Sequence, residues 1–194
     1  CYQLRDEAAE SMSTLTWLRT LVVSECHRLT DAFVVTVARV VPQLHHLHLR
    51  YVRRLTDVSV FAIADGLMGI YSLDLSFCTR VTHAGLIYLI KERRLSLGEL
   101  RLACCRQFDG NGVLRLVREL GTASTCCLSV LDLRDCESAI ESANVARERV
   151  LGDVVLERLR FLKFEQRTDG FFVRSVRWPK EVEELYVEEF RRRG

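Results

Sequence analysis

Segments of about 26 residues with the same pattern of leucines follow one another along this chain. In the segment that starts at Leu18, apolar residues occupy positions 21, 23 and 29, Cys26 stands between them, and Thr30-Asp31 closes the pattern. Four further segments start at Leu44, Ile70, Leu97 and Leu128. The shared pattern is L-x-x-L-x-L-x-x-C-x-x-L-T-D, and its second leucine falls at residues 21, 47, 73, 100 and 131. Self-similarity at a regular spacing is the sequence signature of a repeat architecture.

Weaker copies of the pattern extend the repeats toward both ends of the chain. Toward the C-terminus, Leu159 and Leu185 match the second leucine. In the first of these copies Phe164 stands at the cysteine position and Thr168-Asp169 at the expected helix start. Residues 1–17 match the end of a repeat. The sequence therefore predicts a single domain over residues 1–194, with residues 182–194 as a polar C-terminal cap.

Each part of the pattern predicts a local structure. The L-x-L portion is typical of a short strand whose leucines point inward. The cysteine position suits a small apolar side chain with a weak hydrogen-bond donor, and Thr-Asp offers caps for a helix N-terminus. Apolar residues at helical spacing follow each Thr-Asp pair: Phe33, Val37, Val40; Val60, Ile63, Leu67; Leu86, Leu89, Ile90; Leu114, Val117 and Leu120. These features predict an α/β arc of stacked repeats, with a parallel sheet on the concave face and helices on the convex face.

This pattern resembles the cysteine-containing leucine-rich repeats of F-box substrate receptors. It is also similar to the small mitochondrial leucine-rich-repeat proteins related to ATP synthase coupling factor B. The resemblance covers nearly the whole chain and implies a leucine-rich-repeat solenoid with a horseshoe shape. The chain departs from the F-box proteins because no F-box precedes its repeats, and Val52, Phe164 and Phe190 replace the cysteine.

The cysteines of the chain indicate a reducing compartment. Five of the eight stand at the repeat position, and we interpret them as structural: Cys1, Cys26, Cys78, Cys105 and Cys136. Side chains that recur at one position of a stacked array do not easily reach the distance that a disulfide requires. The chain is therefore expected inside the cell, in the cytoplasm or the mitochondrion. It does not begin with Met, which we interpret as a processed or partial chain and which keeps a mitochondrial location open.

The residues that flank the strand leucines are the candidate partner-binding surface, because side chains alternate along a strand. The candidates on this concave face are His46, His48, Arg50, Asp74, Glu99, Arg101, Asp132, Arg134, Arg158, Arg160 and Tyr186. One column of flanking residues alternates in charge from strand to strand. Such a column predicts either a salt-bridge ladder that neutralises itself or a polar docking surface for a protein, and the two are compatible.

The charge balance disfavours nucleic acid as the partner of this face. The formal net charge is +2, and five arginines among all the flanking residues are matched by five acidic residues. A nucleic-acid groove needs a clear positive excess. Basic residues near the predicted helices, from Arg39 and Lys91 to Arg174 and Arg177, leave contact between a basic edge and RNA as a less favoured alternative.

No motif in the sequence supports catalysis or a cofactor. His46 and His48 share one face of a predicted strand, but they lack an evident third ligand, so no metal site is expected. Phosphate-binding and dinucleotide-binding glycine motifs and the nucleophile elbow are absent from the sequence. There is no apolar run of about 20 residues, so no membrane span is expected.

The sequence thus predicts a non-enzymatic protein-interaction scaffold. The favoured interpretation is an architectural or assembly subunit of a large intracellular complex. A mitochondrial complex is one that fits this interpretation. The alternative is the substrate-recognition module of a cullin ubiquitin ligase whose F-box lies outside this chain. The sequence does not identify the partner.

Overall fold

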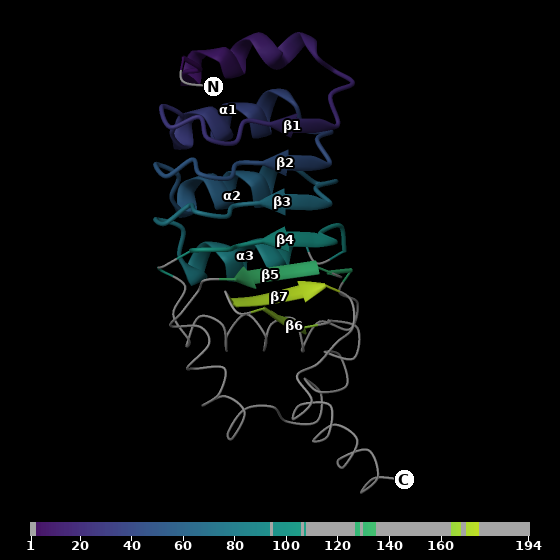
Figure 1. Ribbon diagram of the computed structural model, residues 1–194. Coiled ribbons are helices and arrows are strands. Elements are labelled where there is room, and N and C mark those ends of the chain that lie inside the picture. Colours follow the sequence, from purple (N-terminus) through teal and green to yellow (C-terminus); the bar gives the residue numbers. More distant parts are fainter. Residues whose placement is uncertain are drawn as a thin grey trace, which may run out of the picture.

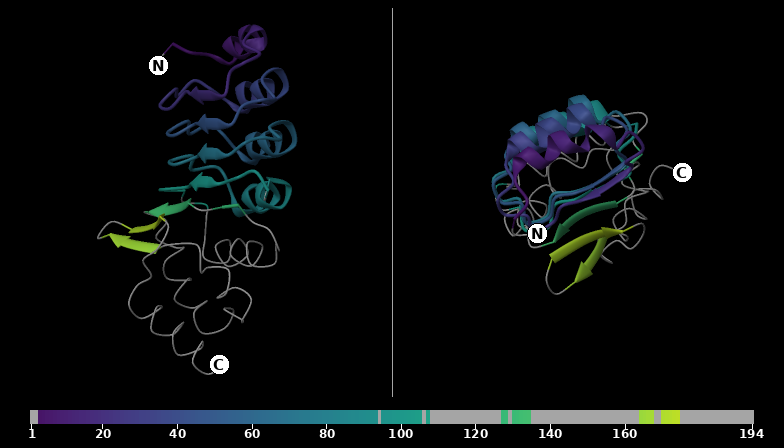
Figure 2. Two further views of the ribbon diagram at one scale, coloured as in Figure 1. Left: turned by 90° about the vertical axis from the view of Figure 1, so that its right-hand side faces the viewer. Right: turned by 90° about the horizontal axis from the view of Figure 1, so that it is seen from above.

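The computed structural model describes residues 3–93, 95–105, 107, 127, 128, 130–134, 164–167 and 170–174. This part of the chain has an α/β architecture with five parallel strands, three α-helices and one 3-10 helix. Units of strand, turn and helix lie one above another in sequence order (Figure 1). The strands form one layer and the helices the other (Figure 2). For these units the structure confirms the expected parallel sheet, with the helices packed against one of its faces (Figure 2).

The parallel strands are short and pair in strict register. They are β1 (Thr20–Val22), β2 (His46–His48), β3 (Ser72–Asp74), β4 (Glu99–Arg101) and β5 (Val130–Arg134). Leu21, Leu47, Leu73, Leu100 and Leu131 are direct partners across the sheet. The pairing continues past the strand ends, because the N–H two residues after each paired leucine donates to the next unit, as that of Leu49 does to the Asp74 carbonyl at 2.8 Å. Each unit therefore depends on its neighbour for backbone hydrogen bonds.

The helices begin at the threonines that the pattern predicts. Helices α1 (Asp31–Val40) and α2 (Asp57–Gly66) follow Thr30 and Thr56, and α3 (His83–Arg93) follows Thr82. Each threonine Oγ1 accepts a hydrogen bond from the N–H two residues later, at 3.2–3.3 Å, which satisfies one otherwise unpaired donor of the first turn. The 3-10 helix η1 (Asp6–Thr14) packs on α1 and buries Ala9.

The core lies between the two layers, and the same positions of each unit contribute apolar residues to it. The strand leucines from Leu47 to Leu131, the leucines at 49, 75 and 102, and the helix residues Phe33, Val60, Ile63, Leu86 and Leu89 are at most 2% exposed. Their burial follows from the period of two in the strands and 3.6 in the helices. The helix predicted around Leu114, Val117 and Leu120 lies outside the described residues.

Carboxylates link the starts of successive helices. Asp31 accepts hydrogen bonds from the N–H and the Oγ1 of Thr56, both at 2.8 Å, in the next unit. Asp57 does the same for Thr82, at 2.7 and 2.6 Å. Asp6 does the same for Thr30, at 2.8 and 2.6 Å. The aspartate of the Thr-Asp pair therefore holds the following unit, whereas the sequence had suggested that it caps its own helix. We call these three pairs the Asp–Thr ladder.

Gly85 leaves space for the Asp57 carboxylate in the last described pair of the Asp–Thr ladder, Asp57 and Thr82. A Cβ atom on Gly85 of α3 would lie 2.7 Å from Oδ1 of Asp57. A larger residue at this position would require the Asp57 carboxylate to shift. Ser59 occupies the equivalent position in α2, and there its N–H and Oγ both bond to Asp31.

The repeat cysteines form a second set of contacts between units. Sγ of Cys78 donates to the Leu49 carbonyl, and Sγ of Cys105 donates to the Leu75 carbonyl, both at 3.3 Å. Cys26, Cys78 and Cys105 are buried, as expected of a small side chain with a weak donor. Burial raises the pKa of Cys78 to about 12.

These thiols should resist alkylation in the folded protein. The thiolate is the reactive form, so at about pH 8 iodoacetamide should modify exposed Cys127 and half-buried Cys104 long before Cys26, Cys78 and Cys105. Peptide mass spectrometry in a time course measures the order, and 6 M guanidinium chloride should make all five react alike. Rapid native modification of Cys78 would contradict the buried position.

The C-terminal edge of the sheet departs from the sequence prediction. We expected a sixth parallel strand around Leu159 beside β5, and a helix after Thr168-Asp169. Instead β7 (Gly170–Arg174) pairs with β5 in antiparallel fashion, and β6 (Phe164–Arg167) pairs with β7. Arg174, which we had grouped with helix residues, therefore ends a strand. Only two residues separate β6 from β7 in the sequence, and such a short connection joins antiparallel strands, not parallel ones.

Candidate functional site

The outer face of the sheet carries two columns of side chains on either side of the leucine column. Val22, His48, Asp74, Arg101 and Asp132 are paired in register in one column. Thr20, His46, Ser72, Glu99 and Val130 form the other. We call this surface the sheet face. At one end β6 and β7 swing out on the side away from the helices (Figure 2).

Hydrogen bonds fix the polar side chains in the middle of the sheet face. Oε2 of Glu99 accepts from Ser72 Oγ of the neighbouring strand at 3.0 Å and lies 3.0 Å from Nη2 of Arg101 on its own strand. Oδ1 of Asp74 accepts from the Ser76 N–H at 2.9 Å, a local turn contact. Glu99 and Arg101 are only 27% and 30% exposed. The ion pair seen here therefore runs within a strand, while the sequence had suggested charge pairing from strand to strand.

The other predicted partner-binding residues lie in different environments. His46 lies edge-on to Tyr71, with ring centroids 5.9 Å apart. Asp132 is fully buried. Arg134 ends β5. Arg158, Arg160 and Tyr186, and the structural cysteines Cys1 and Cys136, lie outside the described residues.

Arg50 belongs to a different surface, the edge formed by the turns between strands and helices. Glu25, Tyr51, Phe77 and Cys104 occupy equivalent positions in these turns and have φ between 58° and 64°. Backbone bonds between units hold this unusual conformation, because the N–H groups of residues 25, 51 and 77 donate to carbonyls of the next unit at 2.7–2.9 Å. Tyr51 and Phe77 consequently stack, with centroids 3.9 Å apart.

Arginines cover this aromatic pair. Cζ of Arg50 lies 5.6 Å from the Tyr51 centroid and 5.0 Å from the Phe77 centroid. Cζ of Arg53 lies 5.3 Å from the Tyr51 centroid. Such contacts orient a guanidinium while its N–H donors remain available. We call this surface, from Arg5 to Arg80 along successive turns, the turn edge.

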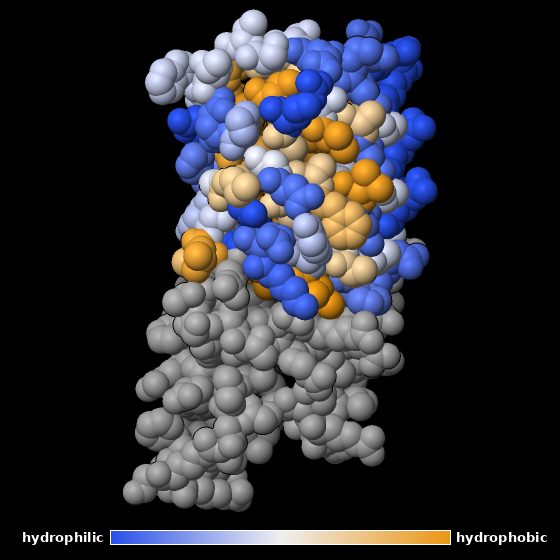
Figure 3. Space-filling model, turned by 180° about the vertical axis from the view of Figure 1, so that it is seen from behind, coloured by the Kyte–Doolittle hydropathy of each residue, from blue (hydrophilic) through white to orange (hydrophobic). Residues whose placement is uncertain are grey.

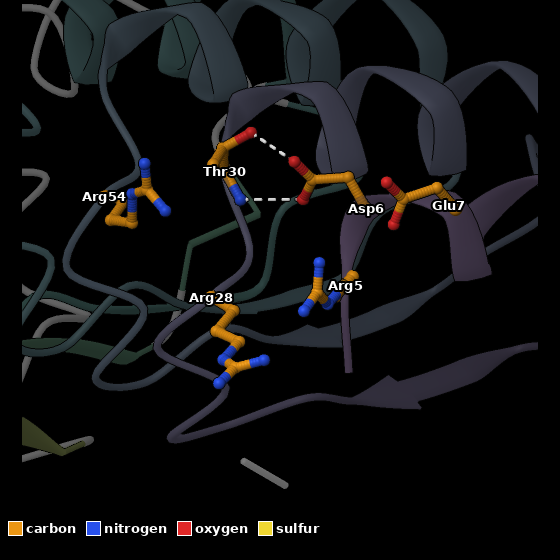
Figure 4. A pocket seen from close by; sticks show the side chains of 6 residues that line it. All are labelled: Arg5, Asp6, Glu7, Arg28, Thr30 and Arg54. Atoms are coloured by element: carbon orange, nitrogen blue, oxygen red, sulfur yellow. Dashed lines mark hydrogen bonds between the residues drawn. The ribbon is translucent and has the colours of Figure 1, made fainter. Parts of the chain in front are cut away.

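An open pocket of about 480 Å³ lies at the N-terminal end of the turn edge. Its lining comprises Arg5, Asp6, Glu7, Arg28, Thr30 and Arg54. Figure 4 shows that the Asp6 carboxylate is directed at Thr30, whereas the three guanidinium groups lie around the space beside this pair. Three arginines and two acidic residues line the pocket, so its lining carries a net positive charge.

The helix face carries a third candidate surface. Val35, Val58, Phe61 and Tyr88 are between 36% and 53% exposed, and Phe61 and Tyr88 meet edge-to-face at 5.2 Å. Hydrophobic residues gather in the middle of this face, and hydrophilic ones border them (Figure 3). A hydrogen bond to Asp65 raises the pKa of Tyr88 and fixes its ring. The helix face is thus less polar than the solvated surface that the sequence suggested, although Arg39 does pair with Glu10 at 2.6 Å.

Within the described ranges, no group of three or more His, Cys, Asp or Glu side chains is arranged to hold a metal ion. None of the described helices combines the length and apolar character that a membrane crossing requires.

Sequence reasoning missed the turn edge and the exposed apolar helix residues. The signal for the first was present, because Arg28, Arg54 and Arg80 recur two residues after positions 26, 52 and 78. The exposed apolar helix residues also had a signal in the sequence. Helices α1 and α2 carry apolar residues on both faces, whereas packing against the core requires them on one face alone. The stacking of Tyr51 on Phe77 had no such signal, since it depends on the left-handed turn conformation.

Comparison with known proteins shows similarity in fold. The sequence matches no protein-family model, and it matches none of the curated proteins. The structure is similar to a chain in the crystal structure of the yeast Rad7 and Elc1 complex, with a TM-score of 0.53 and 20% identity over 66% of this chain. It is also similar to the tropomodulin C-terminal domain of Caenorhabditis elegans, with a TM-score of 0.53 and 12% identity over 77% of this chain and 100% of that domain. The match covers 34% of the yeast chain.

Proposed function

We propose that this chain is a leucine-rich-repeat solenoid of the cysteine-containing kind that serves as a non-enzymatic scaffold for binding another protein. The observation that carries the proposal is the sheet face. Five parallel strands in strict register present polar side chains that are already held by Ser72–Glu99–Arg101 contacts. A surface whose side chains are fixed before binding loses little conformational entropy when a partner docks.

The bonds between units support the same proposal. The Asp–Thr ladder and the cysteine–carbonyl contacts tie each unit to the next, so the sheet face is a rigid platform. The fold similarity adds support, because the yeast structure with a similar fold is a complex of two proteins, Rad7 and Elc1. The proposed partner is a subunit of a large intracellular assembly. In this role the chain provides a binding surface and does not catalyse a reaction.

Charge reversal on the sheet face tests the proposal. Arg101→Glu places a second carboxylate beside Glu99 and should weaken capture of the partner at least about tenfold, which corresponds to about 1.4 kcal/mol. Lys91→Glu, on the exposed outer side of α3, is the matched control and should leave capture within about twofold. The measurement is affinity capture from the native extract, with quantitative mass spectrometry of the recovered proteins.

The outcome also separates the two scaffold roles. Subunits of one stable assembly, lost with Arg101→Glu and retained with Lys91→Glu, support the architectural role. A cullin adaptor among the recovered proteins would favour substrate recognition for a ubiquitin ligase. Equal losses in both variants would refute docking on the sheet face and move the interface to the helix face.

A further inference from the structure

The turn edge has a surplus of arginines that the fold itself does not use. Arg5, Arg28 and Arg54 line one pocket, and among the described residues no hydrogen bond or ion pair engages their guanidinium groups. Arg28 and Arg54 are exposed. Three like charges gathered around one small space repel one another, so an anion that enters the space gains attraction from all three.

The acidic side chains Asp6 and Glu7 offset this cluster only in part, because three arginines line the pocket with them. Asp6 keeps its negative charge, but both of its carboxylate oxygens accept hydrogen bonds from the N–H and Oγ1 of Thr30, at 2.8 and 2.6 Å. Glu7 is exposed and also lines the pocket. Glu25 stands in the same turn as Arg28, and Arg50, Arg53 and Arg80 add three more positive charges along the edge. The six arginines of the turn edge outnumber these three carboxylates, so the edge keeps a net positive charge, in contrast to the balanced sheet face.

The aromatic pair decides between two kinds of anionic partner. Single-stranded nucleic acid binds through bases that stack on open aromatic faces. Here Tyr51 and Phe77 stack on each other, and Arg50 and Arg53 lie over their rings, so the turn edge offers no free platform for a base. The same contacts hold guanidinium groups in fixed orientations, which suits bidentate pairing with carboxylates.

We propose that the turn edge binds an acidic segment of a protein partner, with a Glu or Asp carboxylate seated among Arg5, Arg28 and Arg54. Arg50 and Arg53 extend the contact to further carboxylates along the same segment. This inference rests on the proposed scaffold function and names the chemistry of the partner. The sheet face and the turn edge then act together, since a segment that lies along the turns continues directly from a protein docked on the strands.

A peptide titration tests this site directly. The probe is a fluorescein-labelled 16-residue peptide of alternating Glu and Asp, followed by fluorescence anisotropy with the whole chain at about 50 mM NaCl. We expect saturable binding that weakens about tenfold or more in the Arg28→Glu, Arg54→Glu double variant. Arg19→Glu changes an exposed arginine that precedes β1, at the opposite end of the strands, and should leave the affinity within about twofold. All of these side chains are exposed, so melting curves should be unchanged.

Three results of this titration would overturn the inference. Equal binding of a Gln and Asn version of the peptide would remove the role of the carboxylates. Tighter binding of a single-stranded RNA of equal charge would make the turn edge a nucleic-acid site. An unchanged affinity in the double variant would move the acidic site elsewhere. If this titration fails while Arg101→Glu still abolishes partner capture, the sheet-face proposal stands and only the acidic partner falls.

Discussion

Leu75→Asp should unfold the repeat array. Leu75 is fully buried between the layers, its N–H donates to the Arg101 carbonyl, and its own carbonyl accepts from Cys105. An aspartate there would bury a charge without a partner, which costs several kcal/mol. Since a domain of this size has a free energy of unfolding of about 5–15 kcal/mol, most or all of its stability is lost. Circular dichroism at 25 °C should show loss of helical signal and no cooperative melt.

A graded variant and a matched control keep this prediction informative if the aspartate variant aggregates. Leu75→Ala should lower the free energy of unfolding by about 2–5 kcal/mol, as for other large-to-small changes in packed cores. Leu95→Asp changes a leucine that is 65% exposed, and its effect should stay within about 0.5 kcal/mol. Urea titrations of both give the comparison. A native-like melting curve for Leu75→Asp would mean that the strand places this side chain in solvent.

The leucine prediction succeeded from sequence alone because the information is local and repeated. Leu21, Leu47, Leu73 and Leu100 recur at nearly constant spacing, and one alternation rule assigns every inward residue at once. The Thr N-caps follow from the same logic. The C-terminal strands could not be derived in this way. There the copies are degenerate, and a choice between parallel and antiparallel pairing depends on contacts that are distant in sequence, such as Leu131 with Val173.

The candidate site was predicted less completely than the fold. The sheet-face columns follow from alternation, so His48, Asp74 and Arg101 lie together as expected. Which of these charges pair is a matter of rotamers, and Glu99 turned toward Arg101 and Ser72. The turn edge depends on positive φ values in non-glycine residues. Backbone bonds between units hold that conformation at residues 25, 51 and 77, and a single-repeat pattern does not contain them.

Asp31→Asn should destabilise the protein far more than its position near the surface implies. The Asp31 carboxylate accepts from both donors of Thr56 and from both donors of Ser59, all in the next unit. An asparagine replaces one acceptor oxygen with a donor that faces other donors. We expect the free energy of unfolding to fall by roughly 2–3 kcal/mol, since hydrogen bonds to a charged group are the strong ones. Asp65→Asn, at an exposed carboxylate bonded only to Tyr88, is the control and should change stability by less than about 0.5 kcal/mol.

The same ladder predicts how stability depends on pH. Burial raises the pKa of Asp31, but the hydrogen bonds from Ser59 and Thr56 outweigh it, so the folded-state pKa lies below the ordinary value of 3.8. A depressed folded-state pKa means that the carboxylate contributes its full stabilisation above pH 3.8 and loses it as pH falls through the lower, folded value. The stability gap between the native protein and Asp31→Asn should therefore stay constant from pH 7 to about pH 5 and narrow toward pH 3. Urea titrations at each pH measure this gap. A gap that widens on acidification would require a raised pKa, and hence a ladder in which Asp31 holds its proton and donates to Thr56.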